Sequence, residues 1–247
     1  MKKQLTVALM TALCLSGGVS FAEAPAAAET AVKPCHMDLV LVIDKSGSMY
    51  GLEKDTIGGF NSLIEKQKKE DIPVNVTTVL FDTNNTILHN RTDIGNVGKM
   101  TDKEYIPSGS TALLDAVGNT ITRMDAVPGI NGKTNKVLFV VITDGLENSS
   151  KEYTKDNIRH MISDRTEKDN WEFMYLGANI DAVGEAKDIG ISGDNAVKYQ
   201  NTSSGVRANY AAIAEFASAR AKGDASQAWK DQVEKDEDTE EGDSAVY

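Results

Sequence analysis

Residues 37–48 read MDLVLVIDKSGS, an apolar run that ends in a segment of charged and hydroxyl-bearing residues. Two other segments are also strongly apolar: residues 74–81 (VNVTTVLF) are rich in β-branched side chains, and residues 137–142 read VLFVVI. Strands that are apolar on both faces belong to parallel sheets with helices covering each side. The three segments therefore predict the centre of a parallel sheet.

Three shorter segments extend this predicted sheet. Residues 171–177 and 196–200 have the composition of short strands. Residues 86–92 follow the second apolar run across the polar turn 83–85, so we expect them to pair with it as an antiparallel edge hairpin.

Five segments between the strands carry apolar residues three and four positions apart, as amphipathic helices do. Alternating strands and helices predict an open, doubly wound α/β sheet, mostly parallel, with one antiparallel edge strand and helices on both faces. Right-handed crossovers would place every strand-to-helix loop at one edge of that sheet. The apolar positions are Ile57, Phe60 and Ile64; Leu113, Val117, Ile121 and Met124; Ile158, Met161 and Ile162; Ile180, Val183 and Ile189; and Val206, Tyr210, Ile213 and Ala217.

Oxygen-bearing side chains occur on three of these loops. Asp44, Ser46 and Ser48 form a D-x-S-x-S motif directly after the first strand, Thr111 opens the helix that follows residues 107–110, and Asp144 follows the strand at 137–142. Two carboxylates and three hydroxyls favour Mg²⁺, Mn²⁺ or Ca²⁺ over Zn²⁺. These five residues are therefore the predicted metal ligands.

The order of these motifs resembles that of von Willebrand factor A domains, the family that includes integrin inserted domains, over residues 37–222. The metal-ion-dependent adhesion site of that family has D-x-S-x-S in its first loop, a threonine in its second and an aspartate in its third. The resemblance implies that Ser46, Ser48 and usually Thr111 bind the metal directly, and that the two aspartates often act through water. It also implies a non-catalytic adhesion or scaffold module that captures an acidic residue of a protein partner on the metal.

Two other functions remain open from the residues. A metal-dependent hydrolase or phosphatase can also have an aspartate after its first strand. Haloacid-dehalogenase-type phosphatases, however, have a D-x-D motif at that point, and this chain has Ser46 in place of the second aspartate. None of the three histidines, His36, His89 and His160, belongs to a nucleophile motif. The third possibility is a subunit of a larger, ATPase-linked assembly, which the predicted export disfavours.

The first 24 residues have the three parts of a secretory signal peptide, with predicted cleavage after Ala24. The apolar run at residues 5–15 is shorter than the roughly 20 residues that a membrane-spanning helix needs. We expect a mature chain without a membrane span, located in the periplasm, at the cell surface or in the medium. The short Lys-Lys leader is typical of a bacterium.

The chain is acidic, with 37 acidic and 26 basic residues and a formal net charge of −11. Nucleic acids and anionic membranes require clustered basic residues, so neither is an expected partner. Residues 25–36 are predicted to be a linker. Its Cys35 would be the only cysteine of the mature chain, either an unpaired thiol or a bridge to another chain. Residues 223–247 are acidic and poor in large apolar residues, which predicts a disordered tail.

Asp82, Gly58 and Gly59 lie outside the predicted metal site. Asp82 follows the second strand and is predicted mainly to form a turn, with the alternative that it approaches the site. Gly58 and Gly59 lie inside the first helix, where each costs about 1 kcal/mol relative to alanine. We interpret them as a sign of close packing against the sheet.

Overall fold

The computed structural model describes residues 34–178, 180–225, 229 and 230. These residues fall within one compact unit, residues 31–247. The predicted signal peptide and its cleavage site at Ala24 lie outside the described residues, as does most of the predicted tail.

Six strands form one sheet in the order β3-β2-β1-β4-β5-β6. The pair β2 and β3 is antiparallel, and the other four neighbouring pairs are parallel. The sheet confirms the prediction of a mostly parallel sheet with one antiparallel edge strand. The strands are β1 (His36–Asp44), β2 (Val74–Phe81), β3 (Asn85–Asp93), β4 (Asn135–Thr143), β5 (Trp171–Ala178) and β6 (Ala196–Tyr199).

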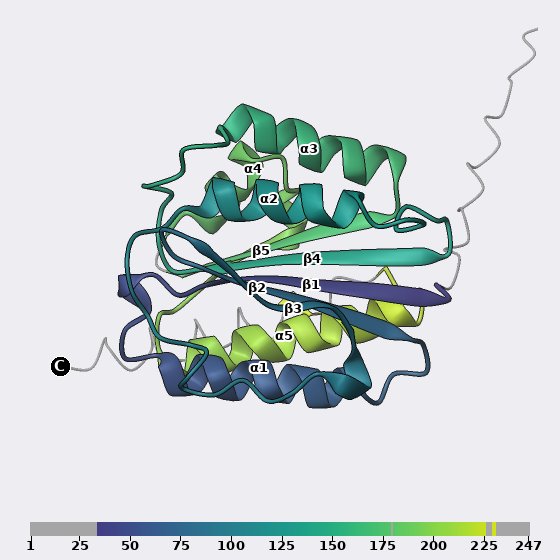
Figure 1. Ribbon diagram of the computed structural model, residues 1–247, viewed down its shortest axis with the longest axis horizontal. Coiled ribbons are helices and arrows are strands. Elements are labelled where there is room, and N and C mark those ends of the chain that lie inside the picture. The colour runs from purple at the N-terminus through teal and green to yellow at the C-terminus, as the bar shows by residue number, and fades with distance from the viewer. Residues whose placement is uncertain (1–33, 179, 226–228, 231–247) are drawn as a thin grey trace, which may run out of the picture. The chain divides into compact units, whose positions relative to one another are not determined.

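Helices cover both faces of the sheet, with α1 and α5 on one side and α2, α3 and α4 on the other (Figure 1). Successive residues of β1 alternate between two buried clusters: Leu39 and Leu41 face α1 and α5, whereas Val40 and Val42 face the opposite layer. This two-sided burial explains the apolar runs and confirms the doubly wound fold. The helices are α1 (Glu53–Gln67), α2 (Leu113–Asp125), α3 (Lys155–Lys168), α4 (Ala182–Asp188) and α5 (Ser203–Ala221).

The carboxyl ends of the parallel strands meet at one edge of the sheet, which we call the carboxyl edge. Asp44, the last residue of β1, is in register with Phe81 at the end of β2. Ile43 is in register with Ile142, one residue before the end of β4. The loops that follow β1, β2 and β4 therefore begin side by side.

The helices α1 and α5 pack closely on each other at Gly59. A Cβ atom at that position would lie 2.3 Å from Cδ2 of Tyr210 on α5, whereas one at Gly58 would meet nothing within 4 Å. The interpretation of close packing therefore needs correction: Gly59 makes room for a neighbouring helix, not for the sheet, and Gly58 has no such role.

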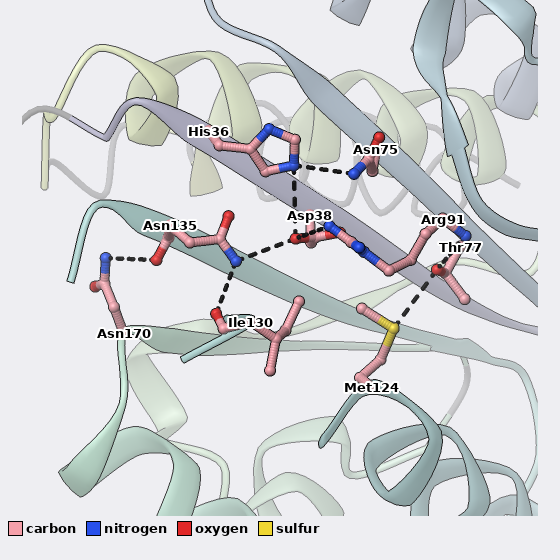
Figure 2. Close-up of polar contacts among 9 residues, drawn as sticks. All are labelled: His36, Asp38, Asn75, Thr77, Arg91, Met124, Ile130, Asn135 and Asn170. Atoms are coloured by element: carbon pink, nitrogen blue, oxygen red, sulfur yellow. Dashed lines mark hydrogen bonds and ion pairs between the residues drawn. The ribbon is translucent and has the colours of Figure 1, made fainter. Parts of the chain in front are cut away.

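A buried carboxylate, that of Asp38, connects three strands near the edge opposite the carboxyl edge through an ion pair and a hydrogen bond (Figure 2). Asp38 on β1 is 1% exposed and accepts hydrogen bonds from Arg91 Nε at 2.7 Å and from Asn135 Nδ2 at 3.1 Å. Arg91 lies on β3 with φ of 47°, next to irregular pairing with β2. Its backbone N–H is bonded to Thr77 Oγ1 at 3.1 Å, which holds the strained residue in place.

Residues on both sides of the predicted domain, residues 37–222, contact it. Cys35, an exposed free thiol, donates its backbone N–H to Thr134 O at 2.9 Å. At the other end, Trp229 is 3% exposed and packs edge-on against Phe216, with ring centroids 5.3 Å apart. Within the described ranges, no helix combines the length and the apolar character that crossing a membrane requires.

Candidate metal centre

The first predicted ligand, Asp44, is fully buried where β1 ends. Its Oδ1 accepts the backbone N–H of Ser46 at 2.6 Å, and its Oδ2 accepts the hydroxyl of Thr143 at 2.6 Å. The carboxylate is thus fixed between its own loop and the end of the neighbouring strand β4.

The two serine hydroxyls of the D-x-S-x-S loop lie next to each other, and one of them contacts Asp144. Ser46 Oγ lies 3.0 Å from Ser48 Oγ, and Ser48 Oγ donates to Asp144 Oδ1 at 2.6 Å. The other oxygen of Asp144 accepts Asn201 Nδ2 at 3.1 Å. Oxygens from two loops far apart in sequence therefore lie within hydrogen-bonding distance of one another.

Thr111 reaches the same place from the loop before α2. A Cβ atom built on Gly145 would lie 3.2 Å from Thr111 Oγ1 and 3.7 Å from Ser48 Oγ, so both hydroxyls face this glycine. Asn148 accepts the backbone N–H of Thr111 through Oδ1 at 2.9 Å and donates its own N–H to Thr111 O at 3.1 Å. All five predicted ligands thus meet at the carboxyl edge, although their binding of a metal remains a prediction.

Burial makes the ionised forms of Asp44 and Asp144 unfavourable. Loss of solvent raises the pKa of Asp44 to about 6, against the opposing effect of hydrogen bonds from Thr143 and Ser46. Burial also raises the pKa of Asp144. The hydrogen bonds described above come from neutral hydroxyl, amide and backbone groups, which do not balance two negative charges.

The donor set suits one hard cation. Among the described residues no three His, Cys, Asp or Glu side chains are grouped so that they could hold a metal, so carboxylates alone cannot make this centre. Two carboxylates with three hydroxyls can still bind Mg²⁺ or Mn²⁺, because such ions commonly keep several waters. A cation would also supply the positive charge that is missing beside Asp44 and Asp144. The five predicted ligands therefore suit a divalent cation.

Lys45, within the D-x-S-x-S loop, pairs with Asp82 instead of with the predicted ligands. Asp82 also accepts the hydroxyl of Ser108 at 2.9 Å and the backbone N–H of Asn84 at 2.7 Å. Burial opposes ionisation of Asp82, but the bonds from Lys45, Asn84 and Ser108 outweigh it and lower its pKa. Asp82 therefore forms the predicted turn and also joins the β2–β3 connection to the site loops.

Backbone hydrogen bonds connect the first two site loops directly. Ser108 N–H donates to Lys45 O at 2.8 Å, and Gly47 N–H donates to Gly109 O at 3.2 Å. Gly109 has φ of +67°, which favours glycine, and a Cβ there would lie 2.7 Å from Thr83 Oγ1. The loop that carries Thr111 is therefore held in one position relative to the D-x-S-x-S loop.

Sequence reasoning missed three residues that position the predicted ligands. Thr143 precedes Asp144 directly, so its place at the end of a strand was a usable signal. Asn148 and Asn201 lie on loops with no recognisable motif, and only the fold brings them to the site.

The fold and this arrangement of loops define an α/β domain with an oxygen-rich centre at its carboxyl edge. Comparison of the sequence with protein-family models finds no match, and comparison with curated proteins finds none either. Comparison with solved protein structures does find similar folds. Those that align include von Willebrand factor A proteins, and the chain has the von Willebrand factor A fold, as predicted.

Three similar structures illustrate this fold. Proximal thread matrix protein 1 from the mussel byssus, with a zinc-occupied metal-ion-dependent adhesion site, is 18% identical with a TM-score of 0.55, covering 76% of this chain and 47% of that one. The pilus adhesin SpaC of Lactobacillus rhamnosus GG is 15% identical with a TM-score of 0.57, covering 75% and 30%. A von Willebrand factor type A protein from Catenulispora acidiphila is 13% identical with a TM-score of 0.50, covering 76% and 43%. The aligned part of this chain spans less than half of each of these proteins.

Proposed function

We propose that this chain binds one divalent cation through Asp44, Ser46, Ser48, Thr111 and Asp144, and uses it to capture an acidic residue of a protein partner. The observation that carries the proposal is the pair of buried carboxylates, with raised pKa values, among three converging hydroxyls. When bound, the cation would supply one positive centre at the protein surface that attracts an outside carboxylate. Mg²⁺ is the first candidate, with Mn²⁺ and Ca²⁺ as alternatives.

The setting we propose is outside the cytoplasm of a bacterium, in an adhesion or scaffold role. The predicted signal peptide supports export. The named neighbours support the role, because they include a byssus matrix protein and a pilus adhesin. The mussel protein, whose adhesion site holds zinc, supports a divalent metal in this fold without favouring magnesium.

The proposed role is binding and not catalysis. His36 contacts Asn75 Nδ2 at 3.1 Å, near the edge opposite the site, and His89 stacks on Phe60 with ring centroids 6.0 Å apart. His160 lies on α3 beside a surface pocket. None of these contacts involves the five predicted ligands, so no histidine is placed to activate a serine there.

Calorimetry on chelator-stripped protein tests the metal site. Mg²⁺ or Mn²⁺ should bind the parent, and Asp144→Asn should weaken binding at least about tenfold because one of two charged ligands is lost. Asp102→Asn, which changes an exposed aspartate, is the matched control and should bind as the parent does. Equal affinity in Asp144→Asn and the parent would refute the site.

A second experiment tests the use of the metal. Proteins from the exporting cell's envelope and medium are captured on the chain in Mg²⁺ and again in EDTA, with Thr111→Ala alongside. Thr111→Ala removes one neutral ligand, so metal affinity should fall modestly while capture falls much further. Capture that is undiminished in EDTA would mean that the partner docks elsewhere. Turnover of a generic phosphatase substrate by the parent, lost in Asp44→Asn, would favour the hydrolase alternative.

A further inference from the structure

Large apolar side chains are exposed at few places on the described surface, and most of those places are at the carboxyl edge. Tyr50 is 82% exposed, Ile106 60% and Leu146 54%, whereas the other exposed large apolar residue, Ile87 at 40%, lies on β3. Single exposed apolar residues are ordinary, but a group of them beside one site marks an interaction surface.

Each of the three residues belongs to a different loop of the candidate metal centre. Tyr50 follows Ser48 by two residues, and Leu146 follows Asp144 by two. Two residues of extended chain span about 7 Å at most, so both side chains start close to the predicted ligands. Ile106 opens the loop that leads to the predicted threonine ligand. We call Tyr50, Ile106 and Leu146 the apolar rim.

Two members of the apolar rim are held in place by buried neighbours. Tyr50 follows the 3₁₀ turn at residues 47–49, whose Met49 is 1% exposed and anchors the loop in the core. Ile106 follows Tyr105, which is equally buried and donates its hydroxyl to Asp44 O at 2.6 Å. Each of these two exposed side chains therefore directly follows a residue that is buried in the core.

The third member, Leu146, precedes a residue that is also fixed. The carboxylate of Glu147 accepts backbone N–H groups of Leu114 at 2.9 Å and of Ser150 at 2.7 Å. This binds the loop after β4 to the first turn of α2. Because its supporting backbone is already ordered, Leu146 can bury its side chain against a partner with little further loss of loop entropy.

The engagement of Lys45 and the net charge of the chain favour a partner with a single carboxylate. Lys45, the basic residue inside the D-x-S-x-S loop, is engaged by Asp82, so it is not free to bind further acidic groups of a ligand. The chain itself has a formal net charge of −11, which repels a partner rich in carboxylates. A second copy of this chain would bring that same charge.

We infer that the partner is a different protein, whose docking segment presents one aspartate or glutamate between apolar side chains. The carboxylate would approach the metal, and its apolar neighbours would pack on Tyr50, Ile106 and Leu146. This inference rests on the proposed metal-dependent capture and specifies the partner's chemistry.

A displayed library of short peptides with a fixed central glutamate and random flanks tests the inference. It is selected on the full chain in MgCl₂, and selected peptides are then measured by fluorescence polarisation. We expect apolar residues on both sides of the glutamate. Each of Tyr50→Ser, Ile106→Ser and Leu146→Ser should weaken binding about tenfold, since each removes a large apolar contact. Ile87→Ser, the matched control on β3, should bind as the parent does.

The possible failures are distinguishable. Selected peptides with acidic or random flanks, no selected peptide at all, or rim variants that bind like the parent while EDTA abolishes binding would overturn the apolar rim and leave metal-dependent capture standing. Binding that persists in EDTA, or when the peptide's glutamate is replaced by glutamine, would refute the proposed function itself.

Sedimentation velocity tests the remaining possibility, that a second copy of this chain covers the apolar rim. We expect the chain to remain monomeric with and without MgCl₂. A magnesium-dependent dimer that is lost in Leu146→Ser would show that a second copy occupies the rim, and would overturn the assignment to a different protein.

Discussion

Asp44 combines two demands that conflict when no metal is bound. Its carboxylate organises the loop by accepting Ser46 N–H and the Thr143 hydroxyl, yet its burial penalises the charge. A cation at the predicted centre would remove that conflict, because it stabilises the ionised form that the hydrogen bonds also favour.

Asp44→Asn is the substitution that separates the two demands. The amide Oδ1 can still accept a hydrogen bond, whereas alanine would leave Thr143 and Ser46 without this partner. We expect metal affinity to fall at least about tenfold, and the free energy of unfolding of the metal-free protein to fall by less than about 1 kcal/mol, because the buried charge disappears. Calorimetry and chemical denaturation in EDTA measure the two quantities. Unchanged metal affinity would contradict the role of Asp44.

His89 should make stability depend on pH. Burial lowers the pKa of this histidine. Its ring stacks on Phe60, and its Nδ1 lies 3.1 Å from Thr78 Oγ1. As pH falls through about 6.5, the unfolded chain gains a proton that the folded chain resists, so the free energy of unfolding should decrease. His89→Phe retains a ring but cannot titrate, so its stability should fall less over the same pH range. Identical pH dependence in denaturant titrations of both proteins would contradict this assignment.

At the scale of elements, α1 and α5 form an extensive contact between two helices. Tyr210 lies against Gly59, and the amide Nε2 of Gln67 on α1 donates to Ala214 O on α5 at 3.0 Å. The glycine lets the aromatic ring pack against the helix backbone, which no larger residue would allow.

Substitutions at the two adjacent glycines of α1 should have opposite effects. Gly59→Ala forces a Cβ into Tyr210 and should lower the free energy of unfolding by about 1–3 kcal/mol. Gly58→Ala meets nothing within 4 Å and should raise it by up to about 1 kcal/mol through helix propensity. Urea denaturation of both variants measures the difference. Equal effects would mean that α5 does not pack on Gly59 as described.

The strands β1 and β3 are coupled through Arg91 and Asp38 across the intervening strand β2. Arg91→Ala leaves a carboxylate that is 1% exposed without its arginine partner, with His36 Nε2 still 3.7 Å away, so stability should fall by about 3 kcal/mol. Lys168→Ala is the control, because its ion pair with Asp164 is largely exposed and should contribute less than about 1 kcal/mol. A loss below about 1 kcal/mol in Arg91→Ala, measured by thermal and urea denaturation, would mean that this pair does not stabilise the sheet.

For the molecule as a whole, the proposed metal should be a stabilising ligand. A ligand that binds only the native state adds about 2.7 kcal/mol at a concentration 100 times its Kd. For a domain of this size that corresponds to a rise in Tm of about 5–10 °C. Thermal denaturation in increasing MgCl₂ should show this rise in the parent and not in Asp44→Asn. An equal rise in both would indicate a general salt effect.

The sequence alone determined the fold class and the candidate ligands. Strands that are buried on both faces require apolar residues at nearly every position, so residues 37–43, 74–81 and 137–142 identified the central sheet. Parallel strands joined by right-handed crossovers have their following loops at one edge, so the order of the elements was enough to place Asp44, Thr111 and Asp144 together. These are consequences of local pattern and chain connectivity.

Only the tertiary structure revealed what supports the candidate centre. Asn201 reaches Asp144, Lys45 is engaged by Asp82, and Gly59 faces Tyr210, each across a long sequence separation. Such contacts depend on the distance and direction between elements that pack together, and no local pattern encodes them. The exposure of Tyr50, Ile106 and Leu146 could not be predicted from the sequence either. The local sequence around an apolar loop residue does not indicate whether the fold buries it or leaves it in solvent.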